Sequence, residues 1–295
     1  MQLSIQGLSK RYPNGVQALN QVSLDIPIGM FGLLGPNGAG KSTLMRTLAT
    51  LQDADSGSAT LGDIDMLNQK QEVRKLLGYL PQDFGVYPNL NAEEMLDHFA
   101  RLKGIHNAAE RKTQVHALLE QTNLMKYRKR SVGGFSGGMR QRFGIAQALI
   151  GQPKLVIVDE PTAGLDPAER NRFHNLFSEI GENIIVILST HIVEDVGDLC
   201  ENMAIIHQGE VLVKGQPEQL LKDTEGLIWE IQAEKSQLQA LQEAYPVISI
   251  RHFAGKLKLR VRSESQPGAD FHAVAPNLED IYFSAIRARE KAPVS

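Results

Sequence analysis

The sequence contains little cysteine and no long apolar run. Cys200 is the only cysteine in 295 residues, so no disulfide can form within the chain, and a reducing compartment is the expected location. No apolar stretch approaches the ~20 residues that a membrane-spanning helix needs. The best candidates, Leu155 to Val158 and Ile184 to Leu188, have the length of strands. We therefore expect that, if the protein acts at a membrane, another chain spans it.

The N-terminus lacks the pattern of a secretory signal, and the charge balance lacks a strong sign. Met1 to Gln6 has no basic start followed by an apolar stretch, so we expect the chain to stay in the cytoplasm. The 31 basic and 34 acidic residues give a formal net charge of -3, which argues against a phosphate backbone as the main partner. No nucleic acid is expected as a ligand. The eight histidines are scattered without metal-ligand spacing.

Short apolar runs alternate with helical patterns along most of the sequence. The runs of strand length are Met30 to Leu34, Leu155 to Val158 and Ile184 to Leu188. The helical patterns are Ala92 to Leu102, Thr113 to Leu119, Gln141 to Ile150 and Pro167 to Ile180. Buried strands separated by helices are typical of a parallel sheet covered by helices. We therefore predict an α/β fold with such a sheet at its centre.

Changes of pattern along the sequence indicate its domains. Asn91 followed by Glu94 is a capping pair that starts a mostly helical region, about residues 90–134. After Lys222 the pattern changes to alternating strands and a final helix over Leu278 to Ile286. We therefore predict a large domain over residues 1–222 and a small α+β appendage over residues 223–295.

One glycine-rich segment predicts a phosphate site. Gly35 to Ser42 fits G-x-x-x-x-G-K-[ST] and stands between an apolar run and a helix that we expect to start at Lys41. Backbone amides at a helix N-terminus can meet a phosphate chain without the bulk of side chains. Lys41 adds a positive charge, and the Ser42 hydroxyl suits Mg²⁺, which prefers hard oxygen ligands. The alternative, a glycine-rich turn with an exposed lysine, leaves the flanking strand and helix unexplained.

A second segment places two acids at the end of a buried strand. Asp159 and Glu160 follow the apolar run Leu155 to Val158. Open α/β sheets bind ligands outside the carboxyl ends of their strands, so Asp159 is predicted to reach the metal that Ser42 holds. Glu160 is then a candidate general base for water. The alternative is a plain acid near the start of the next helix.

A third segment resembles a known family. Ser131 to Arg142 (SVGGFSGGMRQR) is similar to the signature of ABC transporter ATP-binding subunits, usually written L-S-G-G-Q. Shorter elements follow in the order of the family: Tyr12 resembles the aromatic residue that stacks on adenine, Gln82 the Q-loop glutamine, residues 164–167 the D-loop and His191 the H-loop histidine. The resemblance covers about residues 1–222. It implies a P-loop NTPase core with a parallel sheet, an antiparallel N-terminal β subdomain and a helical ABC subdomain.

The resemblance also implies roles for individual residues in binding and hydrolysing ATP with Mg²⁺. The catalytic residues implied are Lys41, Gln82, Glu160 and His191. ATP contacts are implied for Tyr12, Asn37, Gly38, Ala39, Gly40, Lys41, Ser42 and Thr43, and for Ser136, Gly137 and Gly138 of a second copy of the chain. The implied metal ligands are Ser42, Gln82 and Asp159. Two chains arranged head to tail would sandwich two nucleotides, so a single chain lacks a complete site.

The sequence departs from the family pattern in places. Phe135 replaces the usual leucine of the signature, Met139 the usual glutamine, and Gly164 a common serine. Gly78 to Gln82 continuing into Val86 to Leu90, together with Pro276 to Phe283 (PNLEDIYF), resembles the branch that exports antibiotics and other drugs. For Pro276 to Phe283 an ordinary capped amphipathic helix is the alternative.

The partners that the resemblance implies are ATP, a second copy of the chain and a separate transmembrane permease. The expected location is the cytoplasm, peripheral on the inner face of the cell membrane through that permease. A soluble ABC ATPase that acts on ribosomes or DNA is the second hypothesis, although those proteins carry two cassettes or a long coiled coil, and this sequence has one cassette and no heptad stretch. A kinase or GTPase outside the family leaves residues 135–139 unexplained.

Overall fold

The chain divides into two compact units. The computed structural model describes residues 1–82, 84, 85, 87, 89–162 and 165–291. The first unit comprises Met1–Asn202 and Ile206–Val211, and the second comprises Met203–Ile205 and Leu212–Ser295. The chain passes from one to the other along β9 (Asn202–His207) and β10 (Glu210–Gly215). The domain boundary between residues 222 and 223 stays a prediction.

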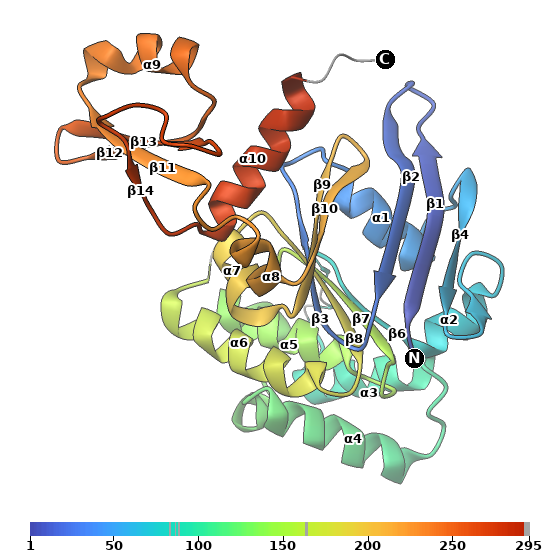
Figure 1. Cartoon of the computed structure of the whole chain (residues 1–295). Helices are drawn as coiled ribbons and strands as arrows, with labels where there is room; N and C mark the ends of the chain where they lie inside the picture. The colour runs from blue at the N-terminus through green and yellow to red at the C-terminus, as the bar shows by residue number, and fades with distance from the viewer. Residues whose placement is uncertain (83, 86, 88, 163–164, 292–295) are drawn as a thin grey trace. The chain divides into compact units, whose positions relative to one another are not determined.

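An antiparallel sheet forms the N-terminal part of the first unit. Its strands are β1 (Leu3–Arg11), β2 (Gln17–Ile26), β4 (Ser56–Leu61) and β5 (Ile64–Asp65), in the order β2-β1-β4-β5 (Figure 1). Leu24 lies opposite Ile5, and both side chains are buried. The antiparallel N-terminal β subdomain that the family resemblance implies is thus present, with one buried apolar face.

A parallel group of strands forms the centre of the same unit. The strands are β3 (Gly29–Leu34), β8 (Ile185–Thr190), β7 (Leu155–Asp159) and β6 (Leu77–Leu80), side by side in that order. Every residue of β7 and β8 is buried, as expected for strands covered on both faces. Because the strands are parallel, Leu34, Asp159 and Thr190 end at the same edge of the sheet. The loops that follow them therefore meet there.

Helices cover this sheet. They are α1 (Lys41–Leu48), α2 (Lys70–Leu76), α5 (Gly137–Ala148), α6 (Pro167–Gly181) and α7 (Val193–Leu199). Helix α1 contacts both β2 and β7, so it lies between the antiparallel and the parallel strands (Figure 1). Helices α6 and α7 contact β3, and α5 contacts β6. The predicted α/β fold with a parallel sheet is confirmed.

The region predicted to be helical contains α3 (Ala92–Leu102), α4 (Ala108–Gln121) and two short 3₁₀ turns, Met125–Tyr127 and Val132–Gly134. Asn91 and Glu94 form the expected capping box, in which the Glu94 amide donates to Asn91 Oδ1 at 3.0 Å and the Asn91 amide donates to Glu94 Oε2 at 3.2 Å. Arg111 of α4 joins Asp97 of α3 at 2.7 Å. The start of α3 was therefore predicted to the residue.

The second unit is a small α+β structure. After α8 (Pro217–Lys222) come β11 (Ile228–Ala233), a 3₁₀ turn (Lys235–Gln237), α9 (Leu238–Ala244), β12 (Val247–Phe253), β13 (Lys256–Arg262), β14 (His272–Ala273) and α10 (Leu278–Lys291). The strands are antiparallel in the order β12-β13-β11-β14. Ile231, Leu259 and Phe271 belong to its hydrophobic core. No helix in the described ranges is both long and apolar enough to cross a membrane.

The start of α10 is fixed by side chains of the same unit. The Asp280 amide donates to Asn277 Oδ1, and the Asn277 amide donates to Asp280 Oδ2, both at 2.9 Å. Asp280 is 1% exposed and also accepts from Arg260 of β13 at 2.7 Å. Arg251 of β12 pairs with Glu279. The segment that resembles the exporter branch is thus a capped helix start joined to two strands.

Candidate active site

The phosphate loop, residues 35–42, connects β3 to α1 at the edge where the parallel strands end. Gly40 has φ 107°, and a Cβ there would lie 2.4 Å from the carbonyl oxygen of Ala18. A Cβ on Gly35 would lie 2.4 Å from the carbonyl oxygen of Ile206. Only glycine fits these two positions. The first turn of α1 carries no acidic residue, so its free amides and positive dipole end remain available to an anion.

Lys41 lies inside this loop. Its side chain is 5% exposed, and Nζ donates to the carbonyl oxygens of Gly35 at 2.6 Å and Pro36 at 3.2 Å. Glu160 Oε1 lies 4.0 Å from Nζ. Burial lowers the pKa of Lys41, while the Glu160 and Asp159 carboxylates act in the opposite direction. Two loop carbonyl oxygens therefore hold the ammonium inside the phosphate loop. The sequence predicts that it contacts phosphate there.

Asp159 ends β7, and its carboxyl group is buried. Burial raises the pKa of Asp159 and so does the neighbouring Glu160, whereas the nearby polar groups of Ser189 and Ser42 and the charge of Lys41 oppose the rise. Ser42, the first residue after the loop lysine, is therefore close enough to Asp159 to lower the pKa of its carboxyl group. A hydroxyl and a carboxylate side by side fit Mg²⁺, which is usually bound through one or two carboxylates together with substrate phosphates.

Replacing Asp159 by Asn is expected to stabilise the nucleotide-free protein. Because the pKa of Asp159 is raised in the folded state, its ionised form costs folding free energy above that pKa, and neutral Asn removes this cost. We expect a gain of about 0.5 to 2 kcal/mol in the free energy of unfolding at neutral pH. The gain should disappear below the pKa of an unfolded carboxyl, where both states are protonated.

Urea unfolding from acidic to neutral pH measures this difference. Asp166→Asn is a matched control, because Asp166 is an exposed cap of α6 and Asn caps a helix equally well. Its stability should equal that of the wild type. If Asp159→Asn is less stable than the wild type at neutral pH, the burial of this carboxylate does not carry the expected cost.

Three side chains converge on Glu160. Its Oε1 lies 3.1 Å from His191 Nδ1 and 4.0 Å from Lys41 Nζ, and its Oε2 accepts from Gln82 Nε2 at 3.4 Å. The Glu160 amide donates to the carbonyl oxygen of Ser189 at 2.8 Å. The backbone of Glu160 has φ 49°, in the left-handed region that residues other than glycine rarely adopt. The other three residues expected to be catalytic thus lie within 4.0 Å of the Glu160 carboxylate.

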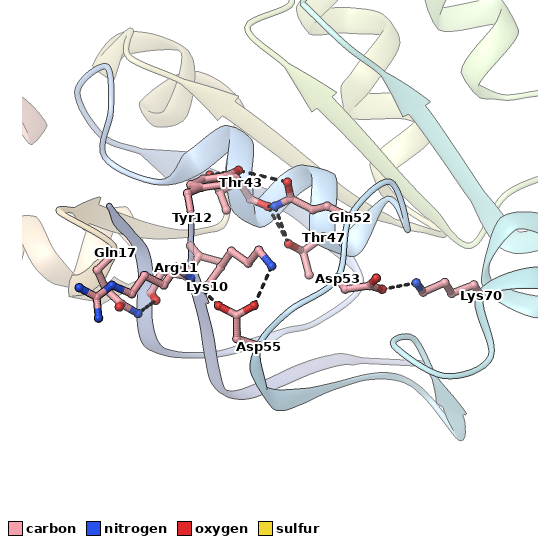
Figure 2. Close-up of polar contacts among 11 residues, drawn as sticks. Lys10, Arg11, Tyr12, Gln17, Thr43, Thr47, Gln52, Asp53, Asp55 and Lys70 are labelled. Carbon is pink, nitrogen blue, oxygen red and sulfur yellow. Dashed lines mark hydrogen bonds and ion pairs between the residues drawn. The ribbon is translucent and has the colours of Figure 1, made fainter. Parts of the chain in front are cut away.

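Tyr12 lies beside α1. Its hydroxyl is 3.2 Å from Thr43 Oγ1 and donates to Gln52 Oε1 at 3.1 Å (Figure 2). The ring is therefore held next to the helix that follows the phosphate loop. Stacking of Tyr12 on adenine stays a prediction. Gln52 was not predicted as a site residue, since nothing in its local sequence distinguishes it from a surface glutamine.

The signature residues lie apart from this cluster. Ser136 caps α5 by accepting from the Met139 amide at 3.3 Å, and Gly138 packs against Glu169 of α6, whose carboxylate also pairs with Arg142 at 3.4 Å. Ser136 and Gly137 are exposed. In the part of the chain that the structure describes, no hydrogen bond or ion pair joins Ser136, Gly137 or Gly138 to the phosphate loop.

Some predicted positions lie outside the described residues. Gly164 of the D-loop element is one of them, and so are Val86 and Pro88 of the segment that resembles the exporter branch. Asp166 of the D-loop is described, and it caps α6 by accepting from the Glu169 amide at 2.9 Å.

Asp195 of α7 is a second residue that the sequence did not reveal. It is fully buried and accepts from Thr162 Oγ1 at 2.5 Å, Arg170 Nε at 2.7 Å and His174 Nε2 at 3.0 Å, if that ring nitrogen carries the proton. It therefore joins the loop after Glu160 to α6 and α7. Its only signal in the sequence is an acid between Val193 and Val196, which are both buried.

Related chains match both the sequence and the fold. The family model described as "ABC transporter" matches residues 19–163. The probable multidrug ABC transporter ATP-binding protein YbhF of Escherichia coli (strain K12) is 34% identical over 302 residues, which cover 96% of this chain and 52% of that protein. The chain thus spans about half the length of YbhF.

Two other related proteins are matched over most of their own length. The ABC transporter ATP-binding protein NatA of Bacillus subtilis (strain 168) is 39% identical over 208 residues, which cover 70% of this chain and 84% of NatA. Among solved structures, cbiO1 of Clostridium perfringens, described as part of the ABC transporter complex cbiONQ, superposes with a TM-score of 0.69. It shares 26% identity, and the match covers 75% of this chain and 90% of cbiO1.

Proposed function

Because the chain belongs to the ABC transporter family of ATP-binding proteins, we propose that it binds ATP with Mg²⁺ and hydrolyses it to drive a transporter whose membrane part is another chain. The expectation of an ATP-binding cassette of the ATPase type is confirmed for the family. The roles of individual residues in this chain are proposals. The observation that carries them is the convergence of Lys41, Gln82 and His191 on the Glu160 carboxylate.

The phosphate loop and its lysine bind the phosphates. The free amides at the start of α1 and the ammonium of Lys41 offset the negative charge, and the glycines let the backbone approach closely. Ser42, Asp159 and Gln82 would hold Mg²⁺, which would neutralise charge on the terminal phosphates. Tyr12 lies beside the same helix and is proposed to stack on the base.

Glu160 acts as the general base for the attacking water. As the water oxygen bonds to the terminal phosphorus and the bond from phosphorus to the ADP oxygen breaks, the water proton passes to a carboxylate oxygen of Glu160. Gln82 and His191 contact opposite oxygens of that carboxylate and so hold its orientation. The residue is only 12% exposed at its side chain, which limits competition from bulk solvent.

The signature residues complete the site of a second copy. Ser136, Gly137 and Gly138 stand at the exposed start of α5, where the amides of a helix N-terminus can receive the terminal phosphate held by another chain. We propose a head-to-tail dimer that closes on ATP and opens after hydrolysis. ATP then biases a two-state equilibrium between separate and joined cassettes.

The proposed partner is a separate transmembrane permease, at the inner face of the cell membrane. The names of YbhF and cbiO1 support transport, and the multidrug description of YbhF supports export. The cassette is proposed to span residues 1–222, and residues 223–295 form the appendage. Action on ribosomes or DNA remains the second candidate, which the net charge of -3 opposes.

Purification from detergent-solubilised cells tests the transport proposal. We expect the tagged chain to co-purify with a polytopic membrane protein, and the purified complex to release phosphate from ATP in the presence of Mg²⁺. Tagged Ser136→Arg chain, which blocks the proposed dimer contact, should retain the membrane partner and lose phosphate release. Recovery of ribosomes or DNA in place of a membrane protein would favour the second candidate.

A further inference from the structure

The turn that follows α1 holds the segment that carries Tyr12. Gln52 Oε1 accepts from the Tyr12 hydroxyl at 3.1 Å, and Asp55 accepts from the Arg11 amide at 2.6 Å and from Lys10 Nζ at 2.7 Å (Figure 2). Three consecutive residues of β1 and the turn after it are thus fixed by two side chains from residues 52–55. The position of Tyr12 depends on this turn.

The Gln52 amide has one possible orientation. Its Nε2 donates to the Thr43 carbonyl oxygen at 2.9 Å and lies 3.0 Å from Thr47 Oγ1. A carbonyl oxygen only accepts, so the amide nitrogen must face Thr43, and Oε1 must face Tyr12. The Tyr12 hydroxyl therefore gives its single hydrogen to Gln52.

This assignment fixes the hydrogen of Thr43. Tyr12 and Thr43 oxygens are 3.2 Å apart, and one of the two must donate. Because the Tyr12 hydrogen already goes to Gln52, Thr43 Oγ1 donates to Tyr12 in the nucleotide-free chain. A phosphate oxygen is an anionic acceptor and forms a stronger hydrogen bond than a phenol oxygen. A nucleotide phosphate in reach of Thr43 would therefore take that hydrogen.

We infer that Gln52 is a positioning residue for nucleotide binding, which keeps the Tyr12 ring in its stacking position once Thr43 turns its hydrogen toward phosphate. The inference rests on the proposed ATP site. With Thr43 engaged, Gln52 is the remaining side chain that fixes the Tyr12 hydroxyl among the contacts described for it. Gln52 is half-buried and its amide hydrogens are both used, so it stays in place without the nucleotide.

A comparison of ADP with inorganic pyrophosphate separates this role from a general effect on the phosphate loop. Both ligands use the loop, and only ADP carries a base that Tyr12 can stack on. We expect Gln52→Leu to weaken ADP binding about three- to tenfold, the scale of one net hydrogen bond, and to leave pyrophosphate binding unchanged. Isothermal titration calorimetry with Mg²⁺ present gives both dissociation constants.

A double-mutant cycle tests the path through the hydroxyl. Tyr12→Phe keeps the ring and removes the hydroxyl, so it should weaken ADP binding by a similar factor, and Gln52→Leu should add less than about twofold in that background. Gln69→Leu is the matched control, because Gln69 accepts one backbone hydrogen bond from Asp65 and contacts neither Tyr12 nor α1 in the described structure. Its binding of ADP should equal that of the wild type.

The possible results distinguish the inference from the function on which it rests. If Gln52→Leu weakens pyrophosphate as much as ADP, or if its effect and that of Tyr12→Phe are additive, Gln52 does not act through Tyr12 and the inference is wrong. Wild-type protein that binds neither ligand would overturn the proposed ATP site, and the inference with it. Tyr12→Phe alone gives the same comparison if thermal melts show that Gln52→Leu does not fold.

Discussion

Lys41→Ala should release no measurable phosphate from ATP and should bind the nucleotide about 10- to 100-fold more weakly. The ammonium is the cation of the phosphate loop, and its replacement removes charge-assisted hydrogen bonds worth roughly 1.5 to 3 kcal/mol. It also leaves Glu160 without its nearest positive charge. Binding is measured by titration with a fluorescent ATP analogue, and turnover by a phosphate-release assay.

Lys103→Ala is the matched control for this variant. Lys103 is another partly buried lysine whose ammonium donates to backbone carbonyl oxygens, here those of Leu77 in β6 at 2.5 Å and Arg74 in α2 at 2.8 Å. Burial lowers its pKa as it does that of Lys41. It lies outside the candidate site. Lys103→Ala should therefore cost stability of a similar kind and keep phosphate release. Near-normal turnover by Lys41→Ala would contradict the site assignment.

Glu160→Gln is expected to bind ATP and to hydrolyse it about 10² to 10⁴ times more slowly than the wild type. Glutamine has the size of glutamate and keeps a hydrogen-bonding oxygen for His191 or Gln82, but it cannot take a proton from water at neutral pH. Lys41, Ser42 and Asp159 are unchanged, so ATP should persist in the site. Phosphate release after a single addition of ATP gives the rate.

The same variant should accumulate as a dimer. If ATP joins the phosphate loop of one chain to Ser136 of another, slow hydrolysis prolongs the joined state, and the dimer fraction should rise with ATP and vanish with ADP. Size-exclusion chromatography with ATP and Mg²⁺ measures it. Glu160→Gln combined with Ser136→Arg should stay monomeric. A Glu160→Gln chain that is inactive and never dimerises would contradict the sandwich, and one with wild-type turnover would remove Glu160 from the mechanism.

The parts of the fold that were predicted correctly depend on local chemistry. Helix α1 starts at Lys41 because a glycine-rich loop ends there, and α3 starts at Ala92 because Asn91 and Glu94 cap each other. Helix α5 starts at Gly137, four residues before the prediction, because the cap on Ser136 outweighs two glycines that interrupt the apolar pattern. Strand β12 was not predicted, because most of its residues are half-exposed or exposed.

The residues of the candidate site also differ in how far the sequence alone could identify them. Residues 35–42 and Asp159 and Glu160 could be found from spacing alone, since the loop and the strand end each carry their chemistry in consecutive residues. Gln82 and His191 needed the family resemblance, because a single glutamine or histidine has no local pattern. Gln52 and Asp195 were missed, because Tyr12 lies 40 positions from Gln52 and Thr162 lies 33 positions from Asp195, and only the fold brings these pairs together.

The structure at the start of α10 gives Pro276 to Phe283 a structural role that is separate from transport. Asn277 caps the helix, Leu278 is buried, and Asp280 serves the cap and Arg260 at once. Loss of Asp280 would leave the Arg260 guanidinium without this counter-charge, so we expect the effects of substitutions at residues 260 and 280 to be coupled. Asn277, Asp280 and Arg260 should therefore recur wherever this sheet and helix occur together, independently of any transported substance. They identify a structural module of the second unit and do not specify a cargo.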